Sequence, residues 1–169
     1  MKLPAHEQPV AFVVALSGSG AAPVVKPRAI SLKPAKARWP QEVVTTIKRS
    51  TAPDAYVVDP IALPTDNPWK RAVRPGDIQF LQDGTGVVIT LDGDVWLARG
   101  LADPADRVRW RRFASGLHEP MTVAIRHEEI FAFDKNGIWR LRDTNGDGEA
   151  DVHELFSNAF GQTADLREF

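Results

Sequence analysis

Residues 142–154, RDTNGDGEADVHE, concentrate oxygen-bearing side chains within one short segment. Counted from Asp143, the segment follows the calcium-loop pattern D-x-[DN]-x-[DN]-G-x5-E. The predicted ligands are Asp143, Asn145, Asp147, Asp151 and Glu154, with the backbone carbonyl of Glu149 as a further donor. Such hard oxygen ligands suit Ca²⁺, whereas zinc and copper prefer His or Cys. The sequence therefore predicts a calcium site in this loop.

The residues flanking the loop indicate what kind of site it is. An EF-hand requires a helix on each side of the loop. Here NGIWRLR precedes the loop and DVHELF follows it, and both read as strands. A calcium ion between two strands is expected to fasten the fold rather than to act as a sensor. The alternative is an Asx-rich turn without an ion, because Asp, Asn and Gly also favour plain turns.

Composition excludes several classes of protein. The chain has 169 residues, 43% of them hydrophobic, a net charge of −1 and no cysteine. Disulfides, thiolate metal sites and Cys-attached haem are therefore excluded. A near-neutral charge gives no general reason to expect nucleic-acid binding. No apolar run approaches the roughly 20 residues of a membrane-spanning helix, so no transmembrane segment is predicted.

The two halves of the chain differ in composition. Residues 1–75 hold eleven of the 13 prolines and are net +6, whereas residues 76–169 are net −7. Because proline disfavours helices and central strands, we expect an irregular, extended segment over 1–54 and a folded domain over 55–169. Short strands are expected at 10–16, where a signal peptide is the alternative, and at 54–59. The basic segment 26–36 is interpreted as a solvated connection.

The second half has the pattern of an all-β protein. Apolar runs alternate with polar residues and are separated by Asp-Gly and Asn-Gly turns, which favour hairpins. No long stretch has the spacing of an amphipathic helix. The predicted strands lie at 77–82, 87–90, 95–98, 109–115, 121–126, 130–134, 138–143 and 152–157.

These strands form a repeat. The phrases GDVWLAR and NGIWRLR place Trp96 and Trp139 at an offset of 43, and Phe113 matches Phe156 at the same offset. A period of 40–50 residues with four strands and a recurring Trp is typical of propeller blades. The expected fold is a partial β-propeller of about two four-stranded blades. Because propellers usually need four to eight blades, we interpret the chain as a fragment of a longer propeller; the alternative is that its open edges are covered by its first half or by another copy.

The phrases DNPWKRAVRPGDIQFLQDGTGVVITLDGDVWLARGL, WRRFASGLHEP and NGIWRLRDTNGDGEADVHELF support a family resemblance. Over roughly residues 55–169 the chain resembles the β-propeller region of exported bacterial proteins known as membrane-bound dehydrogenase domain proteins. These proteins are related to the pyrroloquinoline-quinone (PQQ)-dependent glucose/sorbosone dehydrogenases. The resemblance implies a six-bladed propeller, calcium, export to the periplasm or cell surface, and oxidation of a sugar or polyol. It also implies PQQ and a c-type cytochrome domain as partners in a full-length protein, although this chain contains no CxxCH haem motif.

Residues for catalysis are few. His118 precedes an innermost strand, and a His at that place could remove a proton from a sugar hydroxyl, with Glu119 and Arg126 nearby. The alternative is a polar turn before Pro120. Arginines at 74, 111 and 112 could contact a quinone, although solvated surface charge is the simpler interpretation. The expected function is a calcium-stabilised propeller fragment of an exported sugar dehydrogenase-like oxidoreductase. The alternatives are a non-catalytic carbohydrate-binding or scaffold propeller, and a calcium-regulated binding module.

Overall fold

The structure, a computed structural model, describes residues 18, 20 and 36–160. Contacts divide the chain into two units, Met1–Lys33 and Pro34–Phe169, and the fold below belongs to the second unit. The described residues form nine β-strands and no helix, which confirms the predicted all-β class. Among them there is accordingly no helix of the length and apolarity needed to cross a membrane. The strand expected at 10–16 lies outside the described residues.

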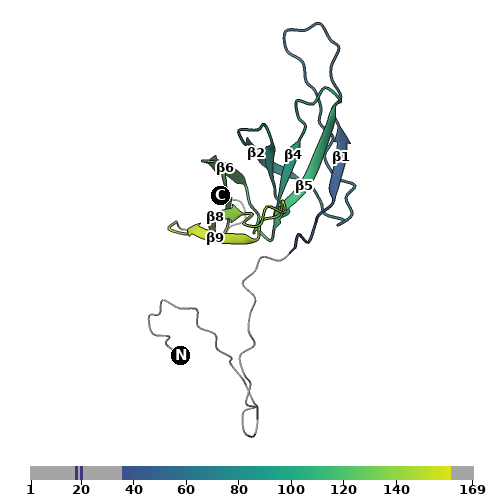
Figure 1. Cartoon of the computed structure of the whole chain (residues 1–169). Coiled ribbons are helices and arrows are strands. Elements are labelled where there is room, and N and C mark those ends of the chain that lie inside the picture. Colours follow the sequence, from purple (N-terminus) through teal and green to yellow (C-terminus); the bar gives the residue numbers. More distant parts are fainter. Residues whose placement is uncertain (1–17, 19, 21–35, 161–169) are drawn as a thin grey trace. The chain divides into compact units, whose positions relative to one another are not determined.

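The strands form two antiparallel sheets (Figure 1). The first sheet has the order β1-β5-β4-β3-β2 and the second has the order β6-β7-β8-β9. The strands of the first sheet are β1 (Glu42–Thr46), β2 (Pro75–Phe80), β3 (Gly86–Thr90), β4 (Asp94–Arg99) and β5 (Arg107–Ser115). The strands of the second sheet are β6 (Thr122–Arg126), β7 (Glu129–Asp134), β8 (Gly137–Arg142) and β9 (Val152–Ser157). Strands β2 to β5 and β6 to β9 are therefore two consecutive four-stranded meanders.

All eight strands predicted in the second half are present, with ends shifted by a few residues. Two expectations for the first half differ from the structure. The strand expected at 54–59 is wrong: these residues form no strand, and Tyr56 is 95% exposed. Prolines bracket this short run on both sides, and no described strand pairs with it. Strand β1, in contrast, lies inside the segment expected to be irregular and pairs antiparallel with β5 as an extra edge strand.

The two meanders share one register. The pairs Leu97–Arg111 of β4–β5 and Arg140–Glu154 of β8–β9 are equivalent at an offset of 43, as are the other pairs of β8–β9. Both ladders also carry an irregularity at the same place, between Val95 and Trp96 and between Ile138 and Trp139. The repeat seen in the sequence is thus present in the hydrogen-bonding pattern of the two sheets.

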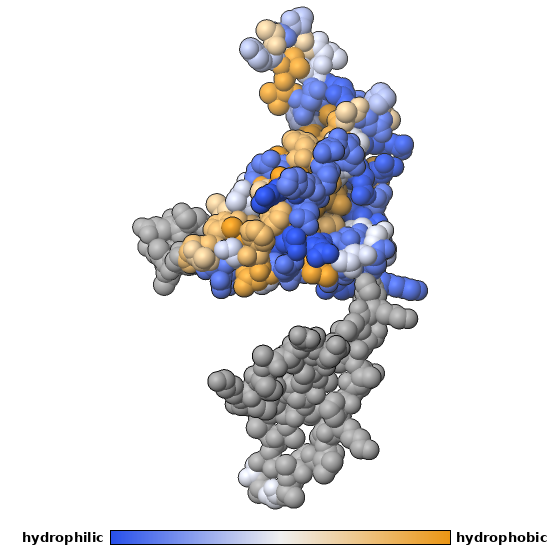
Figure 2. All heavy atoms as spheres, turned by 60° about the vertical axis from the view of Figure 1, so that its left-hand side comes forward, coloured by the Kyte–Doolittle hydropathy of each residue, from blue (hydrophilic) through white to orange (hydrophobic). Residues whose placement is uncertain are grey.

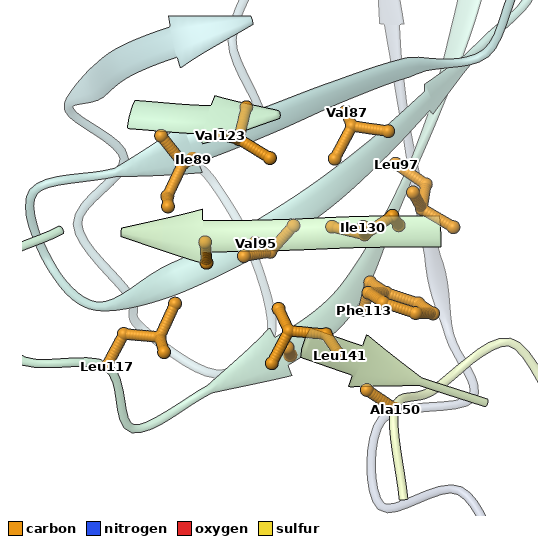
Figure 3. Packing of buried hydrophobic residues seen from close by; sticks show 12 residues of the cluster. Val87, Ile89, Val95, Leu97, Phe113, Leu117, Val123, Ile130, Leu141 and Ala150 are labelled. Carbon is orange, nitrogen blue, oxygen red and sulfur yellow. The ribbon is translucent and has the colours of Figure 1, made fainter. Parts of the chain in front are cut away.

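The main core lies between the two sheets. Figure 3 shows branched side chains of β3 and β4, including Val87, Ile89 and Val95, pointing toward Val123, Ile130 and Leu141 of the second sheet. These side chains are 5% exposed or less. Burial of a Val, Leu or Ile side chain stabilises a fold by about 1.5–3 kcal/mol, so this cluster holds the sheets together. We call the face that the first sheet turns toward the second its front face, and the opposite face its back face. The equivalent positions define the faces of the second sheet, so its back face meets the first sheet and its front face points away from it.

The back face of the first sheet has its own cover. Val88, Trp96 and Trp110 point to this side and are buried under the irregular segment 61–73. Within that segment Trp69 packs against Trp96 with ring centroids 5.8 Å apart. Leu63 and Val73 complete the layer. The Pro-rich segment before β2 therefore covers the back face of the first sheet.

Candidate metal centre

The acidic loop connects β8 to β9 and is organised around Asp143. Its carboxylate accepts hydrogen bonds from the backbone N–H of Gly146 (2.7 Å), Asp147 (3.3 Å) and Gly148 (2.7 Å). Gly148 has a φ of +81°, which glycine adopts without strain. At the base of the loop, the N–H of Asp151 donates to the carbonyl of Arg142 at 2.9 Å. The loop is therefore a closed, internally bonded turn between two paired strands.

Asn145 and Asp147 continue the turn. Asn145 Oδ1 accepts from the N–H of Asp147 at 3.0 Å, and Asp147 Oδ1 accepts from the N–H of Glu149 at 3.0 Å. The carboxylate of Asp151 accepts from both the N–H and the hydroxyl of Thr144, at 2.9–3.3 Å. Each predicted side-chain ligand within the loop thus already bonds to a loop donor. Asp143 Oδ2 and Asp147 Oδ1 each accept one of these bonds, which leaves a lone pair on each oxygen for another donor or an ion.

The loop is held against the first sheet. Arg111 of β5 donates through Nε to the carbonyl of Gly148 at 3.0 Å and through Nη2 to the carbonyl of Asp147. The N–H of Ala150 donates to the carbonyl of Phe113 at 2.8 Å. These contacts join residues 36 or 37 positions apart in the sequence. The loop therefore links the second sheet to the outer strand pair of the first.

Glu149 makes a second link, to the segment that precedes β1. Its carboxylate is buried and accepts from the backbone N–H and the Nε of Arg38, at 2.6 and 2.5 Å. The N–H of Trp39 donates to the same carboxylate at 3.2 Å. The indole of Trp39 lies within 4.2 Å of two guanidinium groups, those of Arg38 and Arg112. The carboxylate of Glu149 is therefore engaged by Arg38 and Trp39, both outside the loop.

Glu154, expected at the last position of the loop, is engaged elsewhere. It lies on β9 opposite Arg140, whose Nη2 donates to its carboxylate at 2.6 Å. This hydrogen bond, together with the negative charge of Glu129, raises the pKa of Arg140. No three acidic or histidine side chains of residues 18, 20 and 36–160 converge on a single point. The acidic residues of the loop are therefore not gathered around one point in this part of the chain, and calcium binding by Asp143, Asn145, Asp147, Asp151 and the carbonyl of Glu149 stays a prediction.

His118 lies in the connection between β5 and β6. Its backbone N–H donates to Asp134 Oδ2 at 2.8 Å, and its carbonyl accepts from the N–H of Lys135 at 3.1 Å. The next residue, Glu119, pairs with Lys135 Nζ at 2.5 Å, and this bond lowers the pKa of Glu119. The main chain of His118 is thus firmly placed, while its side chain is exposed. No hydrogen bond from a described side chain orients its imidazole, as a general base normally requires.

The three arginines considered for a quinone are structural in the described part of the chain. Arg111 holds the acidic loop, and Arg112 is buried against Asp94 at 2.8 Å. Arg74 bonds to Asp92 at 2.7 Å, which lowers the pKa of that aspartate. Sequence reasoning missed the role of Arg38, Trp39 and Arg111 in positioning the loop. Their partners are distant in the sequence, and only the packing of the two sheets against each other brings them together.

Comparison with protein-family models, curated proteins and solved structures found no match to this chain. The site is therefore interpreted from its own residues.

Proposed function

We propose that the loop from Asp143 to Asp151 binds Ca²⁺ and that the ion fastens the second sheet to the first. The support is the placement of the loop: Arg111 holds two of its carbonyls, and Glu149 holds the segment before β1. An ion that gathers Asp143, Asn145 and Asp147 would offset the repulsion among loop carboxylates and stiffen this junction. Strands on both sides of the loop favour a structural ion over a sensor.

We further propose that the chain is part of a β-propeller of an exported, sugar dehydrogenase-like oxidoreductase. The observation that carries the propeller is the shared register of two consecutive four-stranded meanders packed face to face. The dehydrogenase activity, the quinone and export to the periplasm or cell surface rest on the family resemblance described above. In that setting PQQ and a c-type cytochrome would be supplied by other parts of the full-length protein or by a partner. A bound quinone would supply the oxidising chemistry.

A second candidate is a non-catalytic propeller that binds carbohydrate or serves as a scaffold. The observation that favours it is the exposed His118, whose imidazole lacks an orienting partner among the described residues. In this case the calcium loop keeps its structural role. The two candidates are distinguished by whether the protein oxidises a sugar.

The calcium proposal is tested by titrating the chelator-treated protein with CaCl₂ in a calorimeter and by following its melting temperature. We expect one binding event and a higher melting temperature, because a ligand that binds only the folded state stabilises it. Asp147→Ala should abolish both effects. Asp83→Ala, at an exposed turn of the first sheet, is the matched control and should preserve them. Absence of binding heat together with an unchanged melting curve would contradict the proposal.

The oxidoreductase proposal is tested separately on the calcium-loaded full-length protein. PQQ is added with an electron-accepting dye and a panel of sugars and polyols, and dye reduction is followed. Reduction that depends on both sugar and quinone supports the dehydrogenase. Binding of sugars on a glycan array without dye reduction supports the scaffold instead.

A further inference from the structure

The front face of the second sheet, which points away from the first sheet, is apolar and uncovered within the described part of the chain. Phe131 and Phe156 meet edge to face at 5.1 Å, and Phe133 and Phe160 lie 5.2 Å apart. Phe156 is 53% exposed and Phe160 is 37% exposed. Figure 2 shows apolar surface gathered over this part of the molecule. A contiguous exposed apolar patch of this kind usually marks an interaction surface.

Each residue of this face has a counterpart that the first sheet buries. The shared register matches Phe131, Phe133, Ile138, Phe156 and Phe160 to Val87, Ile89, Val95, Phe113 and Leu117. Those five counterparts belong to the core between the sheets, and the most exposed of them is Leu117 at 8%. The same positions are therefore buried in a packing face of the first sheet and are half-buried or exposed in the second.

The packing partner of the front face in the first sheet indicates which kind of surface would cover the same face in the second sheet. It meets the back face of the second sheet, which presents Val123, Ala132 and Leu141, with Trp139 packed beside them. The back face of the first sheet cannot take this role for another copy of the chain, because segment 61–73 already covers Trp96 and Trp110. The two sheets thus pack front face against back face. The back face of the first sheet is covered by segment 61–73, and the front face of the second sheet is uncovered in the described part of the chain.

We propose that the front face of the second sheet docks the back face of a third repeat of this sheet, joined to the second as the second is joined to the first. The partner would carry small or branched apolar residues at the positions of Val123, Ala132 and Leu141. This inference rests on the register and on burial, and it deepens the propeller part of the proposed function. It does not require calcium binding or sugar oxidation.

Charge adds a further requirement on the partner. Arg140 is the counterpart of Leu97, and Leu97 lines a cavity of about 480 Å³ together with Glu128 and Glu129 of the second sheet. In the proposed interface Arg140 would therefore face the positions equivalent to Glu128 and Glu129 in the third repeat. Acidic residues there would pair with a guanidinium that already bonds to Glu129 and Glu154 of its own sheet.

The absence of cysteine from the chain permits a direct test of this surface. A second copy of residues 118–160 is fused directly after Phe160, in place of 161–169, since Phe160 matches Leu117, which precedes His118. Phe156→Cys is then introduced in the original second sheet, and its reaction with a maleimide is timed with and without the fused repeat. We expect the fused repeat to slow the reaction at least about tenfold, because a thiol inside a packed interface reacts only through local opening.

Two controls make the result specific. Leu155, the residue before Phe156 on β9, lies opposite Trp139 on the back face and is 45% exposed, so the reaction rate of Leu155→Cys should be unchanged by the fusion. Ala132→Arg placed only in the fused copy should restore the rate of Phe156→Cys, since it puts a charge into the docking face.

Three outcomes would overturn the proposal. The first is an unchanged rate for Phe156→Cys while circular dichroism shows that the fused copy adds β-structure. The second is a fused copy that adds no β-structure at all. In the natural chain the same residues fold with their back face packed on a front face, so they should also fold on the front face of the second sheet if the proposal holds. The third is protection of Phe156→Cys in the unfused chain that grows with protein concentration and accompanies dimers in sedimentation. That result would make a second copy of the chain the occupant.

Discussion

The indole N–H of Trp139 donates to Asp134 Oδ1 at 2.9 Å, across the turn that joins β7 to β8. The same oxygen accepts from the backbone N–H of Asn136 and Gly137, and Oδ2 accepts from that of His118. Asp134 is 2% exposed, and of these four hydrogen bonds the one from Gly137 is buried and the other three are partly buried. One buried carboxylate therefore ties together the turn, β8 and the connection between the sheets.

Replacing Asp134 by alanine should be among the most damaging single changes in the second sheet. A buried donor left without an acceptor costs about 1–3 kcal/mol and a partly buried one costs less, so the four lost hydrogen bonds should together cost about 3 kcal/mol. Urea unfolding followed by tryptophan fluorescence measures this loss. Asp54→Ala, at an exposed position, is the control and should change the stability by less than about 0.5 kcal/mol. Equal effects of the two substitutions would contradict this account.

The first sheet depends on a buried ion pair. Asp94 is fully buried and bonds to Arg112, whose side chain is 7% exposed, and also to Arg71. Asp94→Ala leaves Arg112 buried without its partner, which should cost about 3–5 kcal/mol. Arg74→Ala breaks an exposed pair with Asp92 instead and should cost at most about 1 kcal/mol. Thermal melts in low and high salt should show a salt-dependent loss for the second variant only. Salt dependence of the Asp94→Ala loss would argue against the pair being desolvated.

Stability should depend on pH through Asp77, which links the two sheets. Its carboxylate accepts from the hydroxyl of Thr122 at 2.7 Å and from the N–H of Val123 at 3.1 Å. Burial acts to raise the pKa of Asp77, but these bonds and that of Ile78 outweigh it and hold the pKa below its ordinary value of 3.8. The charged form therefore stabilises the fold above pH 3.8, and this contribution is lost as the pH falls through the lower pKa of the folded state.

Asp77→Asn isolates that contribution. At neutral pH the variant should melt at a lower temperature than the natural chain, and the gap should close in strong acid, where Asp77 is protonated. Melting curves across an acid titration give the comparison. A gap that stays constant down to the lowest pH would show that Asp77 stabilises the junction by some means other than its charge.

Gly93 should tolerate no side chain. It has a φ of +90°, and a Cβ there would overlap the carbonyl oxygen of Leu117. Gly84 has a similar φ of +80° but open space around it, so it serves as the matched control. We expect Gly84→Ala to cost about 1 kcal/mol through backbone strain alone, and Gly93→Ala to cost clearly more. Chemical denaturation of both variants gives the difference. Equal losses would mean that the contact with Leu117 relaxes freely.

The acidic loop shows where local sequence information is sufficient. Its Asp and Asn residues bond to backbone groups within a few positions, as with Asp143 and the N–H of Gly148, so the turn could be predicted from the spacing of residue types. The contacts of Arg111 and of Arg38 with this loop could not be predicted. They join residues 36 or more positions apart, and nothing in either local pattern marks its partner.

The same distinction applies to the strands. Alternation and Asp-Gly or Asn-Gly turns predicted β2 to β9, because the period of two and the positive φ of a turn are properties of adjacent residues. Strand β1 was missed, since an edge strand such as EVVTT is defined mainly by its pairing with β5. The apolar run at 54–59 has the composition of a strand, but no described strand pairs with it.

Sequence by itself therefore determined the β-class, the hairpins, the 43-residue repeat and the acidic turn. Tertiary structure alone decided which copies of a repeated position are buried. Phe113 and Phe156 share residue type and register, yet the first is 6% exposed and the second 53%. Local chemistry determines which face of a strand a side chain occupies, whereas burial depends on whether another sheet packs against that face.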